Sequence, residues 1–187
     1  MEESVAAVQL AYHMARSRLG RRRLALRTGL TEMAVRIELE RLRDRKLVVL
    51  ERSGVALTAS GRRRFAPLLE PVRSVRGVEL TSLRIGDVGL AAHLTGGKAG
   101  PIWTLRDAAI REGATGLLLL RFGSDGWCFA HDAEPIRRRN PRDAMTIDET
   151  FPDQREQDLL LIASAPDLAR AGLGLWRVVL AVVSGSS

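Results

Sequence analysis

The side chains of this 187-residue sequence that are best suited to chemistry are arginines near its beginning. Arg21, Arg22 and Arg23 are consecutive, Arg52 stands between two short apolar segments, and Arg62 begins a second run of three arginines. A guanidinium group stays charged and donates paired hydrogen bonds that match the oxygens of a phosphate. The clusters therefore predict a surface that binds a polyanion.

The positive charge of the chain is concentrated in its first part. Residues 1–76 contain 17 Lys and Arg against 8 Asp and Glu, a net charge of +9, whereas residues 77–187 contain 12 against 14, a net charge of −2. A basic module joined to a near-neutral one is typical of nucleic-acid binding. The alternative that this charge leaves open is a solvated basic face without a partner.

Catalytic and metal-binding chemistry finds little support in the sequence. Cys128 is the single cysteine, so neither an internal disulfide nor a cysteine-based metal site is expected. His131 and Asp132 form a pair of metal-ligand type, but no second cluster has matching spacing. Gly97-Lys98 lacks the glycine spacing and the following Ser or Thr of a phosphate-binding loop. We therefore expect no enzyme activity, no catalytic residue, no metal and no cofactor.

Targeting and membrane segments are not predicted either. The first helix opens with acidic rather than basic residues, unlike a secretory signal. The longest apolar run near the end, residues 173–183, is interrupted by Arg177 and is too short to span a bilayer. We expect a cytoplasmic protein that does not contact a membrane.

Apolar periodicity predicts a small helical module in residues 1–75. Val5, Val8 and Tyr12 are spaced by three and four, as on one helical face, and Ser4 and Thr31 are suited to cap helices. Gly29 lies in a connection of about four residues, as a DNA-binding pair of helices requires. The expected elements are helices over residues 4–19, 21–27, 31–45 and 62–69, with a two-stranded hairpin over residues 47–50 and 55–57 between the last two helices.

Three motifs within this module carry a family resemblance. They are Leu39-Glu40-Arg41-Leu42, Arg45-Lys46-Leu47-Val48 and Leu57-Thr58-Ala59-Ser60-Gly61. Together they resemble the winged helix-turn-helix transcription regulators of the MarR-like and ArsR-like kinds, over residues 4–70. Pro67 and Pro71 depart from the family, whose fourth helix would continue there, and predict a short or kinked helix before the domain boundary.

The resemblance implies that the third helix enters the major groove of duplex DNA. Its core stripe is Val35, Leu39 and Leu42, so Arg36 points outward and is the best candidate to read a guanine. The alternative is that acidic residues on this helix, such as Glu32, pair with Arg36 within the helix. The full set of expected DNA contacts is Arg21, Arg22, Arg23, Thr31, Glu32, Met33, Arg36, Arg52 and Arg62.

Residues 76–187 read as a small α+β domain with one sheet and two helices, so the whole chain is α+β. Alternating residues from Val78 to Leu94 suggest two strands joined at Gly86-Asp87, and residues 131–156 read as a polar loop. The two-domain layout resembles an archaeal family of predicted regulators. The motifs that carry this second resemblance are Arg106-Asp107-Ala108-Ala109-Ile110, Glu112-Gly113-Ala114 and Ile162-Ala163-Ser164-Ala165.

These expectations combine into a dimeric transcription regulator that binds double-stranded DNA. The homodimer is inferred from the two-fold symmetry of operators. The second domain would dimerise, sense a small-molecule effector, or both, and the loop with Gly96, Gly97 and Lys98 is the candidate effector site. Two alternatives stay open, namely an enzyme of the small-molecule kinase type with an appended winged helix, and a winged helix used for protein assembly.

Overall fold

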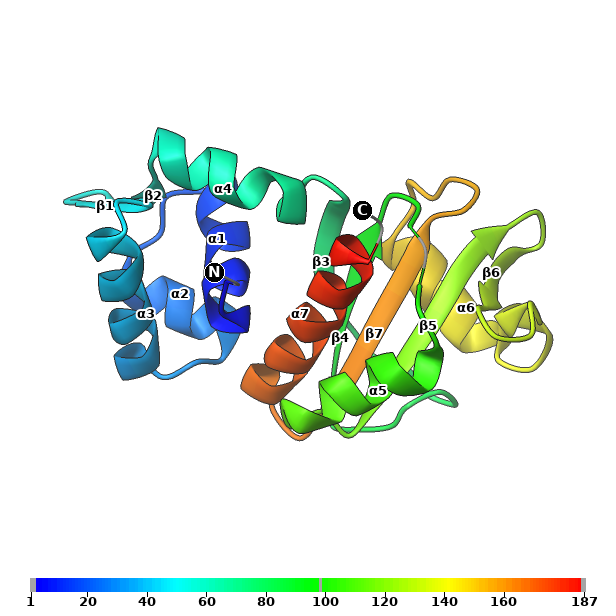
Figure 1. The fold of residues 1–187 in the computed structure, drawn as a ribbon. Helices are drawn as coiled ribbons and strands as arrows, with labels where there is room; N and C mark the ends of the chain where they lie inside the picture. Colours follow the sequence, from blue (N-terminus) through cyan, green and yellow to red (C-terminus); the bar gives the residue numbers. More distant parts are fainter. Residues whose placement is uncertain (1–2, 98, 186–187) are drawn as a thin grey trace. The chain divides into compact units, whose positions relative to one another are not determined.

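The computed structural model describes residues 3–97 and 99–185, so Lys98 of the expected effector loop lies outside the described residues. The chain divides into two compact units, of which unit 1 ends at Glu70 and unit 2 begins at Pro71 (Figure 1). The sequence suggested a boundary near residue 75. The boundary falls earlier because strand β3 begins at Val72 and is hydrogen-bonded into the sheet of unit 2.

Unit 1 contains four helices and a two-stranded sheet within its described residues. Ser4 and Thr31 cap two of the helices as expected, because their hydroxyl oxygens accept hydrogen bonds from the amides of Ala7 and Ala34 at 3.0 and 3.1 Å. The elements are α1 (Val5–Arg16), α2 (Arg21–Thr28), α3 (Glu32–Asp44), β1 (Val48–Glu51), β2 (Gly54–Leu57) and α4 (Ala59–Leu69).

A tight turn joins α2 to α3. Gly29 ends α2 with a φ of 74°, a left-handed conformation that glycine adopts at little cost. The Thr28 hydroxyl donates to the Leu24 carbonyl at 2.8 Å and closes the last turn of α2. The predicted stripe of α3, Val35, Leu39 and Leu42, is buried in the core. The two helices thus form the expected helix-turn-helix.

The hairpin β1–β2 forms the wing. Leu19, in the connection between α1 and α2, adds an isolated bridge to Val55 of β2. Gly54 is required here, since its φ is 128° and a Cβ atom would lie 2.9 Å from the carbonyl carbon of Leu19. Three helices followed by a hairpin and a fourth helix define unit 1 as a winged helix-turn-helix.

The Leu57-Thr58-Ala59-Ser60-Gly61 motif ties α4 to the end of α3. The Thr58 hydroxyl donates to the Lys46 carbonyl at 2.8 Å and accepts from the Gly61 amide at 3.0 Å. The Thr58 amide donates to the Leu47 carbonyl at 3.0 Å. Capping by Thr58 starts α4 three residues before the expected position, and the helix continues past Pro67 to Leu69.

Unit 2 is built on a five-stranded sheet in which every neighbouring pair is antiparallel. The strand order is β3-β4-β7-β5-β6, so the last strand of the chain lies at the centre. The α+β prediction is confirmed. The elements are β3 (Val72–Val78), β4 (Val88–Leu94), α5 (Ile102–Arg111), β5 (Gly116–Gly123), β6 (Gly126–Phe129), the 3-10 helix η1 (Ile136–Arg138), α6 (Pro141–Thr150), β7 (Leu159–Ala165) and α7 (Leu168–Ser184).

Helices cover both faces of this sheet. Helix α7 packs on β4 and β7, and α5 packs on β5 and on α7, so these two helices share one face (Figure 1). Helix α6 packs near β3 on the other face, over a core that includes Ile147, Leu160 and Ile162. All seven residues of β7 are consequently buried.

Two expectations for unit 2 are wrong. The segment over residues 131–156 holds η1 and α6, so the described part of unit 2 contains three α-helices instead of two. Helix α6 forms because Pro141 occupies its first turn and Ala144 and Ile147 bury one face. Gly86-Asp87 is not a hairpin turn, because β3 ends at Val78 and a nine-residue loop, residues 79–87, precedes β4.

Candidate nucleic-acid interface

A groove of about 570 Å³ lies on unit 1 between the start of α2, the outer face of α3 and the wing. Three of the predicted DNA contacts, Arg21, Arg36 and Arg52, line this groove together although they come from different elements. Arg43 lines it as well. Four arginines therefore line one concave surface.

Helix α3 presents Arg36, Glu40 and Arg43 along one side because they are spaced by four and three residues. Arg36 Nε donates to Glu40 Oε1 at 2.9 Å, and both side chains are about half exposed. The alternative that named Glu32 as the partner of Arg36 is therefore replaced by a pair with Glu40, which lies one turn after Arg36 instead of one turn before it. Arg36 stays at the surface, where it can contact a ligand.

Glu40 is the acidic centre of this arginine cluster. Its pKa is held below the ordinary value by the hydrogen bond from Arg36, which outweighs partial desolvation, and by the charges of Arg43 and Arg21. The pKa of Arg36 is raised in turn by Glu40. Glu40 thus orients the guanidinium of Arg36, and the arginines around it leave the cluster with a positive excess that attracts anions.

The wing holds a second ion pair beside the groove. Arg18, between α1 and α2, pairs with Glu51 of β1 and donates to the Ser53 hydroxyl at 3.2 Å. These contacts occupy the carboxylate of Glu51 and leave neighbouring Arg52 exposed at the tip. Since Arg52 also lines the groove, the wing tip adds a cation to this surface.

The start of α3 is exposed and carries an apolar patch. Thr31, Glu32 and Met33 are all at the surface, as predicted for contacts with DNA. Met33 is 61% exposed and Ile37, one turn later, is 43% exposed. Large apolar side chains at the surface of a helix that also carries Arg36 indicate a contact face and not a purely solvated one.

The remaining predicted contacts lie outside the groove. Arg22 and Arg23 are exposed on α2, and Arg62 is exposed on α4. Arg43 was missed by the sequence analysis, although its position seven residues after Arg36 places it on the same helical face. Arg64, the last residue of the second arginine run, is bound to Glu3 instead of facing a ligand.

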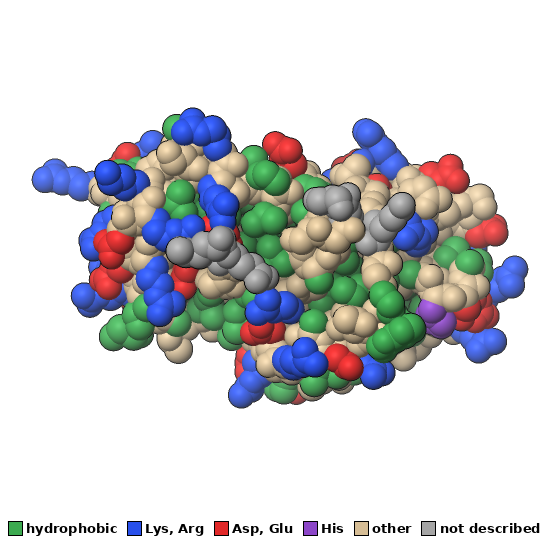
Figure 2. All heavy atoms as spheres, viewed as in Figure 1, with side chains coloured by type: hydrophobic (Ala, Val, Ile, Leu, Met, Phe, Trp, Pro, Cys, Tyr) green, Lys and Arg blue, Asp and Glu red, His purple; other side chains and the backbone are tan. Residues whose placement is uncertain are grey.

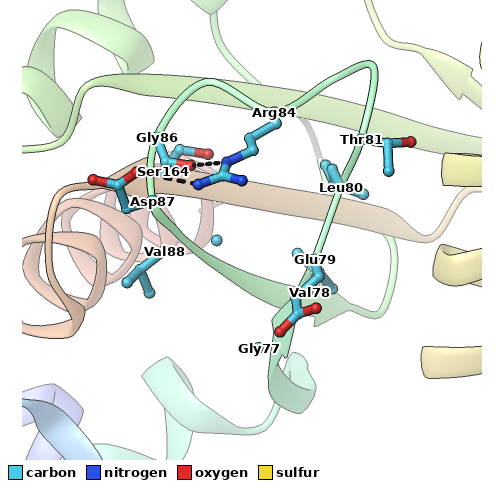
Figure 3. A pocket seen from close by; sticks show the side chains of 11 residues that line it. Gly77, Val78, Glu79, Leu80, Thr81, Arg84, Gly86, Asp87, Val88 and Ser164 are labelled. Atoms are coloured by element: carbon cyan, nitrogen blue, oxygen red, sulfur yellow. Dashed lines mark hydrogen bonds and ion pairs between the residues drawn. The ribbon is translucent and has the colours of Figure 1, made fainter.

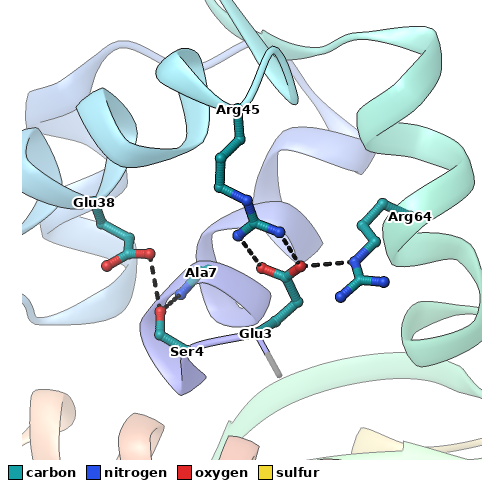
Figure 4. A network of polar contacts seen from close by, with 6 residues as sticks. All are labelled: Glu3, Ser4, Ala7, Glu38, Arg45 and Arg64. Atoms are coloured by element: carbon teal, nitrogen blue, oxygen red, sulfur yellow. Dashed lines mark hydrogen bonds and ion pairs between the residues drawn. The ribbon is translucent and has the colours of Figure 1, made fainter. Parts of the chain in front are cut away.

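A buried carboxylate links three helices of unit 1 (Figure 4). Glu3 accepts two hydrogen bonds from Arg45, at 2.6 and 2.7 Å, and one from Arg64 Nε at 2.7 Å. The Ser4 hydroxyl donates to Glu38 Oε1 at 2.9 Å beside this network. Because Arg45 ends α3 and Arg64 lies in α4, Glu3 joins the start of α1 to both.

Replacing Glu3 with glutamine should destabilise unit 1 by about 1–3 kcal/mol, because the charge-assisted hydrogen bonds from two guanidinium groups lose their anionic acceptor. Hydrogen exchange of amides in α1, α3 and α4, followed by mass spectrometry of the full chain, measures this effect locally. Glu32→Gln is the matched control, since Glu32 is an exposed carboxylate at the start of α3. Equal exchange in the Glu3→Gln and Glu32→Gln variants would contradict the prediction.

The same network predicts a pH dependence. The pKa of Glu3 lies below its ordinary value of 4.5, chiefly through the hydrogen bond from Arg45, with burial opposing and Arg64 reinforcing the shift. A lowered pKa in the folded state adds stability that is complete above pH 4.5 and is lost as the pH falls through the lowered pKa. The difference in stability between wild type and Glu3→Gln should therefore shrink below pH 4.5.

The surface charge follows the division into two units. In Figure 2 blue side chains are more frequent than red ones over unit 1, whereas blue and red are evenly interspersed over unit 2. The view agrees with the excess of Lys and Arg in residues 1–76. An anionic ligand would therefore be attracted more strongly by unit 1 than by unit 2.

The expected effector loop follows β4 in unit 2. Gly96 and Gly97 adopt φ values of 60° and 115° in the turn after this strand, and Lys98 is outside the described residues. The cavity of unit 2 is lined by other segments.

Within residues 3–97 and 99–185, no cluster of three His, Cys, Asp or Glu side chains has metal-site geometry. No helix in the same ranges is long and apolar enough to cross a membrane.

Comparison with known proteins also divides the chain into two parts. Residues 9–72 match the family described as the CggR N-terminal DNA binding domain, which corresponds to the winged helix of unit 1. Residues 87–182, slightly more than half of the chain, match the family described as Domain of unknown function (DUF4443). The chain therefore belongs to the DUF4443 family.

A solved structure shares the fold over the whole chain. The hypothetical protein PH0730 from Pyrococcus horikoshii OT3 has a TM-score of 0.77 and 23% sequence identity, and the match covers 98% of this chain and 95% of that one. No curated protein matches the sequence. The structural likeness establishes a common architecture and carries no statement about ligands.

Proposed function

We propose that the protein is a DNA-binding transcription regulator whose helix α3 enters the major groove, while the wing contacts the backbone or the minor groove. The observation that carries the proposal is the groove in which Arg21, Arg36, Arg43 and Arg52 meet beside the exposed face of α3. The match of residues 9–72 to a DNA binding domain family supports the same conclusion. A guanidinium-lined concavity beside a projecting helix is complementary to a duplex.

Side chains on α3 suggest which bases the protein reads. Arg36 can donate two hydrogen bonds to O6 and N7 of a guanine. Met33 and Ile37 flank it with exposed apolar surface, which suits the methyl group of thymine. Thr31 and the free amides at the start of α3 are positioned to hold a phosphate, helped by the helix dipole. We therefore expect a half-site with guanine and thymine adjacent in the major groove.

Replacing Arg21 with alanine tests the phosphate contact. Binding of a random 20-base-pair duplex should weaken steeply as salt rises, because each neutralised phosphate releases counterions. The slope of log Kd against log salt should become shallower by about 1 in Arg21→Ala, since one phosphate contact is lost. Fluorescence anisotropy at several salt concentrations gives both slopes.

Arg106→Ala is the matched control for this titration, because Arg106 is an exposed arginine of unit 2 outside the groove. It should leave the slope unchanged. A slope that is the same in wild type and Arg21→Ala would remove Arg21 from the interface. Failure of the wild-type protein to bind any duplex at low salt would instead favour a winged helix used for protein assembly.

The finer features of the regulator are part of the same proposal. We expect kinship with the MarR-like and ArsR-like regulators, a homodimer that matches a two-fold operator, a cytoplasmic location, and modulation by an effector through unit 2. Analytical ultracentrifugation with and without operator DNA tests the dimer directly, and a monomer on a two-fold site would contradict it.

A further inference from the structure

Unit 2 contains a cavity of about 880 Å³ that the DNA-binding proposal does not use (Figure 3). It lies between the end of β3, the loop over residues 79–87 and the ends of strands β4 and β7. Every lining residue belongs to unit 2. Its size suits a metabolite of ordinary dimensions.

The floor of the cavity is formed by a row of residues from neighbouring strands. Val78, Gly89 and Ser164 are paired in one row across β3, β4 and β7, and Gly116 of β5 continues the row. Ser164 is 6% exposed, and within residues 3–97 and 99–185 its hydroxyl makes no hydrogen bond. An almost buried hydroxyl in the lining of a cavity, without a protein partner there, is available to a ligand.

The loop that walls the cavity is held by a buried carboxylate. Asp143 of α6, which is 1% exposed, accepts hydrogen bonds from the amides of Thr81 and Leu83 and from the Thr81 hydroxyl, all at 2.7 Å. Burial alone would raise the pKa of Asp143, but these hydrogen bonds outweigh it and lower the pKa. The carboxylate therefore stays ionised and keeps the loop in place.

The far end of the loop is held by close backbone contact. A Cβ atom on Gly86 would lie 2.7 Å from the Thr115 hydroxyl and 2.9 Å from the Ala165 amide nitrogen, so the chain passes here without room for a side chain. With Asp143 at one end and this contact at the other, the nine-residue loop has one defined shape before any ligand binds. A preformed wall lowers the entropic cost of binding.

Opposite charges line the same cavity. Arg84 donates from Nε to the Gly86 carbonyl and from Nη2 to Asp87, both at 3.1 Å, which orients its guanidinium. Its Nη1 makes no hydrogen bond with the described residues. Glu79 also lines the cavity, is exposed, and has no hydrogen bond or ion pair to the described parts of the chain. Asp87 lines the cavity too, and its pairing with Arg84 leaves Nη1 as the open donor of that guanidinium. A simple anion would be repelled by Glu79 and Asp87, whereas a ligand that carries both a carboxylate and an ammonium group can satisfy Nη1 of Arg84 and Glu79 together.

We infer that this cavity binds a small zwitterion of the amino-acid class. The carboxylate of the ligand is bound by Arg84 and the Ser164 hydroxyl, and its ammonium group is bound by Glu79. The inference deepens the proposed regulator by naming its effector class, and it depends on that function for the consequence of binding but not for binding itself.

Calorimetry on the full-length protein without DNA tests the inference. The probes are the twenty common L-amino acids, each with the matched amine that lacks the carboxylate and the matched acid that lacks the amine. We expect at least one amino acid to bind, and each matched analogue to bind about tenfold more weakly or worse, because one charged partner is missing. No binding by any amino acid at 10 mM (roughly the weakest affinity that a metabolite sensor can use), or equal binding by an analogue, would overturn the inference.

Two variants assign the site. Arg84→Ala should weaken the binding amino acid about tenfold or more, and Glu79→Gln should restore part of the affinity of the acid that lacks the amine. Arg106→Ala, on α5, should change neither. Because Glu79 is exposed and has no hydrogen bond or ion pair to the described residues, the Glu79→Gln result is informative even if Arg84→Ala does not fold. Unchanged affinity in both variants would place the ligand elsewhere and contradict the inference.

The amino-acid site and the DNA-binding function can be refuted independently of each other. The calorimetry contains no DNA, so a negative result leaves the salt titration of duplex binding untouched. Conversely, a protein that binds an amino acid in this cavity but ignores duplex DNA would retain the ligand site and lose the regulator.

Discussion

Replacing Gly61 with alanine should destabilise unit 1 by about 3 kcal/mol, the upper part of the range for overpacking. A Cβ atom at this position would lie 2.0 Å from the carbonyl oxygen of Leu47 and 3.0 Å from its carbonyl carbon. The obstacle is backbone, so a rotamer change cannot relieve it. Helix α4 would have to move away from the end of α3, which also breaks the hydrogen bonds of Thr58.

The control for this prediction is Gly20→Ala. A Cβ atom on Gly20 would meet nothing within 4 Å, and Gly20 has an extended conformation with a φ of −71°. Urea denaturation followed by far-ultraviolet circular dichroism and by the emission of Tyr12, which is the single tyrosine and lies in α1, reports on unit 1. If both glycine variants unfold at the same urea concentration as wild type, the close packing of α4 is not required.

Replacing Arg36 with alanine should weaken binding to the preferred DNA site by about 1–3 kcal/mol, because a bidentate contact to guanine is lost. The effect on a random duplex should be smaller, since phosphate contacts from the other arginines persist. The preferred site is first selected from a random duplex library. Anisotropy at one salt concentration then compares the selected site with a version in which each guanine is replaced in turn.

The neighbouring carboxylate needs its own control, because Arg36→Ala leaves Glu40 without its 2.9 Å partner and places an uncompensated negative charge near DNA. The double variant Arg36→Ala/Glu40→Ala separates this repulsion from the lost contact. Arg41→Ala, an exposed arginine of the same helix outside the groove, should leave affinity unchanged. An equal loss on every sequence would show that Arg36 binds phosphate and reads no base.

The sequence predicted unit 1 well because local signals determine it. Ser4 and Thr31 act as helix caps, Gly29 takes a left-handed turn, and the apolar stripe of α3 is buried as its spacing indicated. In unit 2 the local sequence patterns are weaker, and contacts between distant residues decide part of the structure. Helix α6 was missed because its buried residues Asp143, Ala144 and Ile147 are too few to stand out among polar neighbours, and Asp143 is buried only because it binds a loop about 60 residues earlier.

Parts of the candidate site could not be predicted from the sequence alone. Arg21, Arg36 and Arg52 were named separately, but only the packing of the wing beside α3 brings them to one groove. The alternative that Arg36 pairs within its helix named Glu32, but the partner is Glu40, since residues four apart in either direction are equally close on a helix. The cavity of unit 2 depends on a row of residues from three strands, and their register is a tertiary property.

The late position of β7 affects how the two units form as the chain leaves the ribosome. Unit 1 is complete once α4 has been made, and most of its elements pack on near neighbours in the chain. The sheet of unit 2 cannot assemble until residues 159–165 emerge, because β4 and β5 pair with β7 and not with each other. Since domains fold as units during synthesis, the winged helix should be folded while the earlier strands of unit 2 still lack their central strand, β7.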